Sequence, residues 1–166
     1  MELKEALEKL NESKEFKEWK QKNPDTFFSY ALKISEENKE QPWNLGFYRK
    51  STGKVVTFIV DEKIDMQEEE EIFKKPDAEV KPIETEKAKM SFSGILKKTK
   101  EFTNKTYSSE LINKTIAILQ NLEKYGTVWN ITQITSSFNT INIKADAEDG
   151  RILYNKIESI MGLIKK

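Results

Sequence analysis

Histidine and cysteine are both absent from the 166 residues of the chain. The lack of histidine removes the commonest general base near neutral pH, the Ser-His nucleophile pairs and the imidazole ligands of most zinc and iron sites. The lack of cysteine removes disulfide scaffolds and thiolate sites. Glycine-rich phosphate loops and dinucleotide-binding fingerprints are missing as well. These absences predict a protein that is not an enzyme and that holds no cofactor and no metal ion.

The chain also lacks an excess of either charge and a long hydrophobic run. Lys and Arg together number 28, and Asp and Glu together also number 28, so no dominant field attracts phosphate backbones or anionic lipid. No run of about 18 apolar residues is present. The opening residues, MELKEALEKL, are typical of a charged helix rather than of a signal peptide. We therefore expect a cytoplasmic protein that binds neither nucleic acid nor membranes.

Bulky apolar residues, in contrast, are plentiful enough for a core. Nine Phe, five Tyr and three Trp residues belong to a hydrophobic set that makes up 37% of the sequence. A chain of this length folds as one domain or as two small ones, and it needs no disulfide to do so. The composition argues against disorder throughout the chain.

The first part of the chain predicts an N-terminal helical segment over residues 1–22 and then a helix that begins at Asn23-Pro24-Asp25. Apolar residues recur at helical spacing in residues 1–22. Asn can cap a helix, and Pro is tolerated in the first turn, where its missing N–H is not needed. The side chains expected along one side of the second helix are Phe27, Phe28, Ala31 and Leu32.

After Pro42 the apolar period changes from that of a helix to that of strands. Residues 43–48 and 55–61 predict two strands joined by a hairpin loop, in which Gly53 takes a positive φ. Residues 64–73 predict a third, acidic strand at the edge of the sheet, where consecutive glutamates discourage pairing with other chains. Residues 23–75 thus form a first helix-plus-meander unit, and residues 76–89 form a linker.

A second unit of the same plan is predicted over residues 90–166. Ser91 caps a helix that runs to Phe102. Residues 112–122, 128–135 and 138–145 predict strands, with a hairpin loop that ends at Gly126. An apolar stripe then predicts a closing helix. The residues of that stripe are Leu153, Ile157, Ile160, Met161 and Ile164. Helix followed by meander, twice, gives an α+β fold with helices packed on antiparallel sheet.

The stretch INIKADAEDGRIL, residues 141–153, resembles the end of a PepSY domain, in which a last strand runs into a V-D-A-x-T-G-x-V-L-like turn. Asp149 stands where that pattern usually has Thr. The likeness covers roughly residues 90–166, and the first unit is similar in plan alone. The resemblance implies a non-catalytic binding or inhibitory module. The whole chain also resembles uncharacterised archaeal proteins, a likeness that implies no activity.

Two tryptophans occupy comparable places in the two units, Trp43 and Trp129, each followed by Asn on a predicted strand. One interpretation is that each Trp anchors the core of its own sheet against a helix. The other is that Tyr48, Trp129 or Phe138 forms an exposed aromatic patch on the sheet face away from the helices, suited to a peptide or protein partner. These three residues are the candidate interaction surface.

Three functions are consistent with these observations. The preferred hypothesis is a non-catalytic binding protein with two PepSY-like units that acts through peptide or protein contacts. The second is a small-molecule-binding protein or enzyme that uses carboxylate, Lys or Tyr groups in a pocket between the units. The third is a structural or assembly component that uses unpaired sheet edges to form homo-oligomers.

Overall fold

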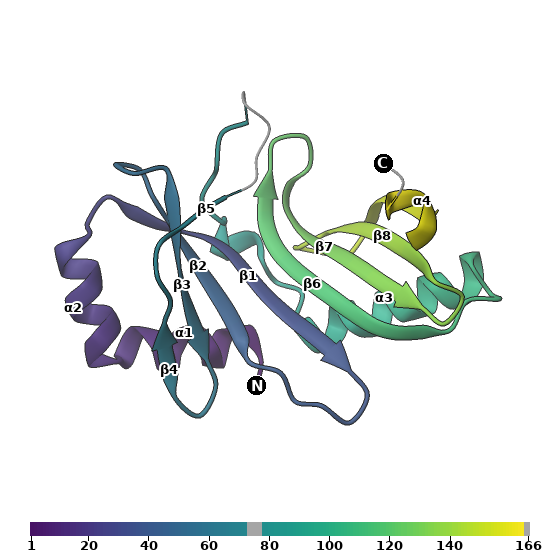
Figure 1. The fold of residues 1–166 in the computed structure, drawn as a ribbon, viewed down its shortest axis with the longest axis horizontal. Helices are drawn as coiled ribbons and strands as arrows, with labels where there is room; N and C mark the ends of the chain where they lie inside the picture. The colour runs from purple at the N-terminus through teal and green to yellow at the C-terminus, as the bar shows by residue number, and fades with distance from the viewer. Residues whose placement is uncertain (73–77, 165–166) are drawn as a thin grey trace.

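The computed structural model describes residues 1–72 and 78–164, and in these residues an antiparallel sheet of nine strands is covered by helices on one face (Figure 1). The α+β class predicted from the sequence is therefore confirmed. The helices are α1 (Leu3–Glu12), α2 (Lys14–Lys22), the 3-10 helix η1 (Thr85–Lys87), α3 (Phe92–Thr106) and α4 (Ile160–Ile164). The strands are β1 (Thr26–Glu36), β2 (Trp43–Arg49), β3 (Lys54–Val60), β4 (Ile64–Met66), β5 (Glu70–Glu71), β6 (Ile112–Leu122), β7 (Gly126–Thr135), β8 (Asn139–Asp146) and β9 (Ile152–Ser159).

Both meanders belong to the same sheet, whose strand order is β4-β3-β2-β1-β6-β7-β8-β9, with β5 also paired to β3. The first strand of each meander meets the other in antiparallel register, from Tyr30 opposite Gln120 to Glu36 opposite Lys114. On either side of this β1–β6 joint the following strands are added outward in chain order. Each half thus adds its strands in the same sequence, starting from the joint.

The core lies between the sheet and the helices. On the first half, α2 packs onto β2 and β3 through Phe16, whose ring centroid lies 5.0 Å from that of Phe47 and 5.2 Å from that of Phe58. On the second half, α3 covers β7 and β8, and Ile95 belongs to the same buried cluster as Ile131. Within the described residues, α1 and α2 therefore cover one half of the sheet and α3 covers the other, as Figure 1 shows.

Residues 78–89 of the predicted linker form a strap that passes between the separated ends of β1 and β6. Lys81 forms an isolated antiparallel bridge with Asn121, at the end of β6. Two residues later, the Ile83 N–H donates to the Phe28 carbonyl in β1, at 3.0 Å. Both halves of the sheet thus form hydrogen bonds with the backbone of the strap. Residues 73–77, part of the predicted first unit and linker, lie outside the described residues.

The helix predicted to begin at Asn23-Pro24-Asp25 is wrong, because residues 26–36 form strand β1. A β-bulge shifts the register between Phe28 and Tyr30. The extra residue interrupts the two-residue alternation, so that apolar side chains fall at 27, 28, 31 and 32 and imitate a helical period. The helices of the first half are instead α1 and α2, in the segment predicted to be helical.

The prediction of a closing helix is also wrong over most of its length, again because of a β-bulge. Residues 152–159 form strand β9, and only the short α4 follows. The β8–β9 register shifts between Lys144 and Ala145, which pair with Tyr154 and Ile152 and leave Leu153 as an extra residue. Here too a bulge sets apolar residues at a spacing that resembles a helix.

Several local predictions are confirmed. Gly53 and Gly126 end hairpin loops with φ of 69° and 79°, a region that glycine enters without strain. Ser91 caps α3 by accepting a hydrogen bond from the Gly94 N–H at 3.0 Å. The acidic edge strand predicted over 64–73 is present as the short β4 and β5, while Phe73 lies outside the described residues.

Candidate binding groove

The three residues of the predicted interaction surface do not lie together. Trp129 is only 1% exposed and faces the helices, so it cannot belong to an exposed patch on the opposite face. Its indole N–H donates to the Met90 carbonyl at 3.3 Å. Trp129 instead contributes to the core at the joint, where its ring centroid lies 6.4 Å from that of Trp43 and 6.3 Å from that of Phe92. The two tryptophans thus anchor one shared core rather than two separate ones.

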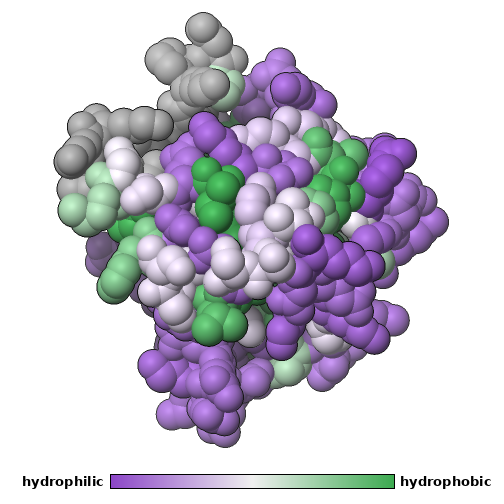
Figure 2. Space-filling model, turned by 90° about the vertical axis from the view of Figure 1, so that its right-hand side faces the viewer, coloured by the Kyte–Doolittle hydropathy of each residue, from purple (hydrophilic) through white to green (hydrophobic). Residues whose placement is uncertain are grey.

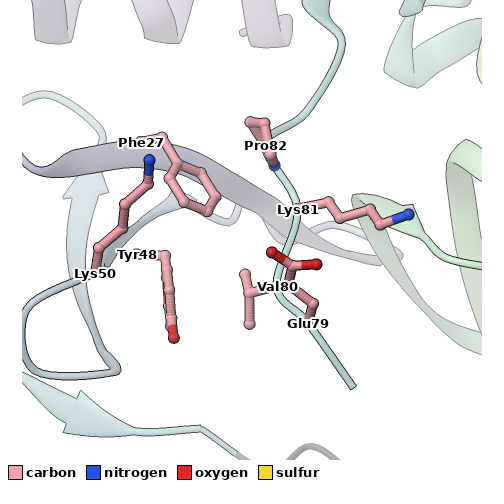
Figure 3. Close-up of a pocket in the computed structure, with 7 residues that line it drawn as sticks. All are labelled: Phe27, Tyr48, Lys50, Glu79, Val80, Lys81 and Pro82. Atoms are coloured by element: carbon pink, nitrogen blue, oxygen red, sulfur yellow. The ribbon is translucent and has the colours of Figure 1, made fainter. Parts of the chain in front are cut away.

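Tyr48 does lie on the open face of the sheet, beside Phe27, with ring centroids 5.4 Å apart. The two rings line a cleft of about 570 Å³ whose other wall is the strap at residues 79–82 (Figure 3). The Lys50 ammonium group lies 5.7 Å from the Phe27 ring centroid. Figure 3 shows the polar ends of Lys50, Tyr48 and Lys81 pointing in different directions. The cleft therefore offers contact area without a converging set of polar groups.

Phe138 is the third predicted residue, and it lies in the turn between β7 and β8. Its side chain is 71% exposed, and its φ of 58° is unusual for a residue that is not glycine. The neighbouring chain holds this conformation, because the Phe138 N–H donates to the Thr135 carbonyl and the Phe138 carbonyl accepts from the Ile160 N–H. Of the three candidates, Phe138 is the one that is largely free of the core.

An apolar groove of about 530 Å³ lies over the β1–β6 joint, on the helix-covered face. One wall is α1, through Leu3 and Leu7, and the opposite wall is the end of the strap. Leu119 belongs to the floor, and it pairs with Ala31 of β1 and with Trp129 of β7, which places the groove across both halves. The remaining apolar lining residues are Phe28, Ala88, Met90, Phe92 and Trp129.

Hydrogen bonds from both halves hold the walls of this groove in place. The Glu2 carboxylate precedes α1 and accepts from the N–H groups of Phe92 and Ser93, at 2.9 and 3.1 Å. It thus caps the N-terminus of α3, where the helix dipole favours a negative charge. On the opposite wall, the Met90 N–H donates to the Ala147 carbonyl at 2.9 Å. The groove is therefore built into the fold rather than left between loosely placed segments.

The pKa of the Glu2 carboxyl group reflects this position. Burial raises the pKa of Glu2, but hydrogen bonds from the Ser93 side chain and from the Ser93 and Phe92 N–H groups together hold it below its ordinary value of 4.5. The carboxylate form is therefore the one that the α1–α3 contact stabilises.

Lys33, in β1, is a buried charge that sequence reasoning did not single out. It is 5% exposed, and its ammonium group donates to the Met1 carbonyl and to the Glu40 carboxylate, both at 3.1 Å. It also lies 5.3 Å from the Trp43 ring centroid and 5.4 Å from that of Phe92. The Lys33 hydrogen bond and charge lower the pKa of the Glu40 carboxyl group. These contacts compensate the Lys33 charge within the molecule. They also connect Met1, at the start of the chain, to strand β1 at the joint.

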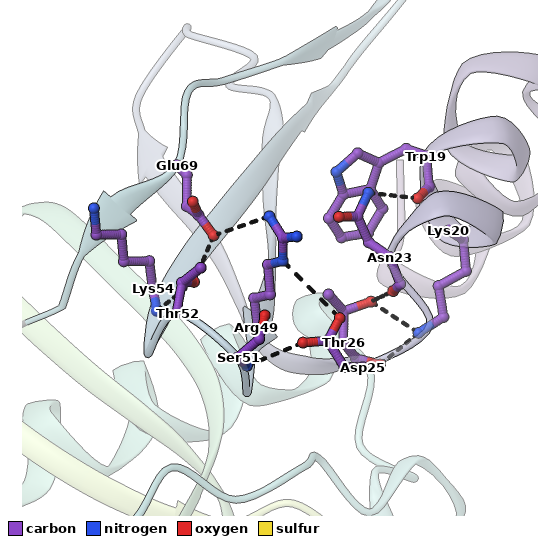
Figure 4. A network of polar contacts seen from close by, with 10 residues as sticks. All are labelled: Trp19, Lys20, Asn23, Asp25, Thr26, Arg49, Ser51, Thr52, Lys54 and Glu69. Carbon is purple, nitrogen blue, oxygen red and sulfur yellow. Dashed lines mark hydrogen bonds and ion pairs between the residues drawn. The ribbon is translucent and has the colours of Figure 1, made fainter.

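A separate polar network surrounds the β2–β3 hairpin (Figure 4). The Arg49 guanidinium group lies 3.9 Å from the Asp25 carboxylate and 3.7 Å from the Glu69 carboxylate. Glu69 also accepts from the Thr52 hydroxyl at 2.6 Å, and Asp25 accepts from the Ser51 N–H at 3.0 Å. These contacts connect the hairpin to the start of β1 and to the acidic segment, so we assign them to holding the turn.

Comparisons with known proteins give no relatives to reason from: no family model, no curated protein and no solved structure matches the chain significantly. Among the described residues, no group of three or more His, Cys, Asp or Glu side chains is placed to hold a metal ion. In that same part of the chain, no helix combines the length and apolarity needed to cross a membrane.

Proposed function

We propose that this protein is a non-catalytic binding protein that acts through peptide or protein contacts, and that its groove between α1 and the strap receives apolar side chains of the partner. The observation that carries the proposal is the lining of the groove, which is mainly aliphatic and aromatic and comes from both halves of the sheet. Concave, mostly apolar sites of several hundred cubic ångströms are typical of binding sites. The proposal includes a relationship to PepSY domains. The two helix-plus-meander units are compatible with that relationship.

The charges at the rim of the groove bear on how the protein would select a partner. The charged side chains at the rim include Lys4 and Glu8 on α1 and Lys89 on the strap, so neither sign of charge dominates. Attraction of one charge sign would therefore contribute little to selectivity. Each Leu- or Phe-sized side chain that the groove buries contributes about 1.5–3 kcal/mol. Two such anchors in a peptide would supply much of a micromolar affinity, which corresponds to about −8 kcal/mol.

A peptide selection tests the proposal. A random library is selected on the native chain, and the affinity of the recovered peptides is measured by isothermal titration calorimetry with wild type and with variants in both walls. Leu7→Glu on α1 and Ala88→Glu on the strap each place a charge in the groove. We expect each to weaken binding at least about tenfold, since an unpaired carboxylate in an apolar site costs well over 1.4 kcal/mol.

The matched control is Glu12→Gln, an exposed position on α1 outside the groove lining, which should leave the affinity unchanged. Thermal unfolding followed by circular dichroism establishes that each variant is folded at the binding temperature. The proposal is wrong if the selected peptides bind the two wall variants as tightly as wild type. It is also wrong if the groove accepts small apolar molecules and no peptide.

A further inference from the structure

A second hollow lies farther along the β1–β6 joint, beside α3, with a volume of about 620 Å³. A row of polar side chains from three neighbouring strands lines it. Ser35 of β1 lies opposite Thr115 of β6, and Thr115 lies opposite Gln133 of β7. The apolar groove lies over Leu119 instead. We call the hollow between this row and α3 the polar pocket, and it is a separate site from the groove.

The polar row offers hydrogen-bond donors that the protein itself does not use. Gln133 is only 1% exposed, and its side-chain oxygen accepts a hydrogen bond from the Thr103 hydroxyl. In the part of the chain that the structure describes, no group accepts a hydrogen bond from the Gln133 amide nitrogen. The Ser35 and Thr115 hydroxyls likewise have no partner among these residues. Because buried polar groups are nearly always hydrogen-bonded, free donors that line a cavity indicate a ligand that supplies acceptors.

Lysine side chains give the polar pocket a local excess of positive charge. Lys97 and Lys100 lie about one turn apart on α3, and Lys114 lies on β6. Lys114 forms an ion pair with Glu36 at 3.3 Å, whereas Lys97 and Lys100 have no ion-pair partner among the described residues. Glu37 is the one carboxylate in the lining. Although the chain as a whole is neutral, this pocket therefore attracts anions.

The surroundings of the polar pocket favour a small polar ligand. Figure 2 views the side of the molecule on which α3 ends and β6 begins, and it shows a largely hydrophilic surface with separate apolar residues in green. The apolar residues of the pocket lining are Leu96 and Ile112 alone. Its volume lies within the range of small-molecule sites, about 300–1,000 Å³. The ligand is therefore a small anion rather than an apolar protein surface.

We propose that the polar pocket binds the phosphate group of a small molecule. Ammonium and amide N–H groups donate, so the ligand must bring acceptor oxygens. A phosphate group has three such oxygens and close to two negative charges, which suits two unpaired ammonium groups and an amide better than a carboxylate does. Lys97 and Lys100 contact the charged oxygens, and Gln133 donates from the sheet. This site goes beyond the proposed function and does not depend on it.

Isothermal titration calorimetry at low salt tests the proposal, with inorganic phosphate and with glycerol 3-phosphate as probes. Lys97→Gln and Lys100→Gln each remove one charge at an exposed position of α3, and each should weaken binding about three- to tenfold. The matched control is Lys98→Gln, which should leave the affinity unchanged, because the Lys98 ammonium group donates to the Asp149 carbonyl and does not line the pocket. Tighter binding of glycerol 3-phosphate identifies a phosphate ester as the ligand, and equal binding identifies the free ion.

NMR places the ligand without altering the core. The side-chain amide signals of Gln133 should shift when either phosphate probe is added, and acetate at the same concentration should leave them in place. The proposal is overturned if neither probe binds with a Kd below about 10 mM. It is also overturned if Lys97→Gln and Lys100→Gln bind as tightly as Lys98→Gln, or if the Gln133 amide signals stay unchanged when the protein is saturated.

Discussion

The two halves of the sheet follow the same plan but fill their cores with different side chains. The first half is aromatic, and Phe16 of α2 contacts Phe47 and Phe58 of the sheet, the latter edge to face. The second half has an aliphatic core under α3 and includes a buried polar contact, in which the Thr103 hydroxyl donates to the Gln133 side-chain oxygen. The plan therefore depends on which positions face the helices, and less on which apolar residue occupies them.

The difference follows from the helices that cover each half. Two short helices of ten and nine residues cover the first half, and large rings from α2 and the strands fill the space beneath them. One helix of fifteen residues covers the second, and its Thr99 and Thr103 are fully buried against the sheet. Among the described residues, the aromatic contacts between the halves lie at the joint, in the Trp43, Phe92 and Trp129 cluster.

The largest effect is expected at the joint. Trp43→Ala removes a buried ring that packs against both halves, and it should lower the free energy of unfolding by about 3–5 kcal/mol. Urea denaturation measures this loss. Trp19→Ala, at a half-buried ring of the first half alone, is the comparison and should cost clearly less. If both variants lost the same free energy of unfolding, the joint would contribute no more to stability than the rest of the core.

Exchanging aromatic and aliphatic side chains between the two cores should destabilise the protein less than the loss of Trp43. Phe58→Leu puts an aliphatic residue into the aromatic half, and Ile143→Phe puts a ring into the aliphatic half. Each should lower the free energy of unfolding by about 1–3 kcal/mol, the first through a cavity and the second through overpacking. The same denaturation experiment measures both. If both variants were as stable as wild type, the two cores would be interchangeable and the contrast between them would carry no information.

The buried polar contact of the second half gives a smaller effect. Gln133→Leu deprives the Thr103 hydroxyl of its partner and should cost about 1 kcal/mol. The double variant Thr103→Val with Gln133→Leu removes both polar groups and should recover most of that loss, because neither is then left unsatisfied. Thermal unfolding of the single and double variants measures the recovery. A double variant that is less stable than the single one would contradict this account of the contact.

The smallest effect concerns the charge that connects α1 to α3. The folded pKa of Glu2 lies below its ordinary value of 4.5, so its stabilising contribution is present above pH 4.5 and is lost as the pH falls through the folded pKa. Glu2→Gln should lower the free energy of unfolding by less than about 1 kcal/mol at neutral pH. Below pH 4.5 the gap between variant and wild type should close. Glu12→Gln serves as the control, and a constant gap across this pH range would argue against the carboxylate as its cause.

Much of the fold follows from the sequence wherever local signals are uninterrupted. The Ser91 cap, the loops ending at Gly53 and Gly126, and the strands β2, β3, β6, β7 and β8 were predicted, since each depends on neighbouring residues alone. The errors fall at the bulges of β1 and β9, where one extra residue converts an alternating pattern into an apparent helical one. A bulge is specified by its partner strand, and that partner is not visible from a local pattern.

The candidate groove was less predictable than the fold. The helix-side face of β6 consists of Thr115, Ala117 and Leu119, and these residues give little apolar signal beside the isoleucines of the opposite face. The pairing of β1 with β6 joins residues that are 78 to 90 positions apart in the sequence, from Glu36 with Lys114 to Tyr30 with Gln120, and no periodicity reports such a pairing. The equivalent positions of Trp43 and Trp129 were a signal in the sequence for the joint, where the two ring centroids lie 6.4 Å apart, but the pattern did not show that they belong to one core.

Hydrogen exchange at the β1–β6 joint tests most directly whether the two halves form one sheet with a groove across it. The measurement follows the backbone amides of residues 30–36 and 114–120 by mass spectrometry or NMR. Because these strands lie in the middle of the sheet, we predict that their paired amides exchange only through global unfolding, as slowly as those of β2 and β7. Exchange in both segments orders of magnitude faster than in β2 and β7 would show that the halves separate, and the account would then be wrong.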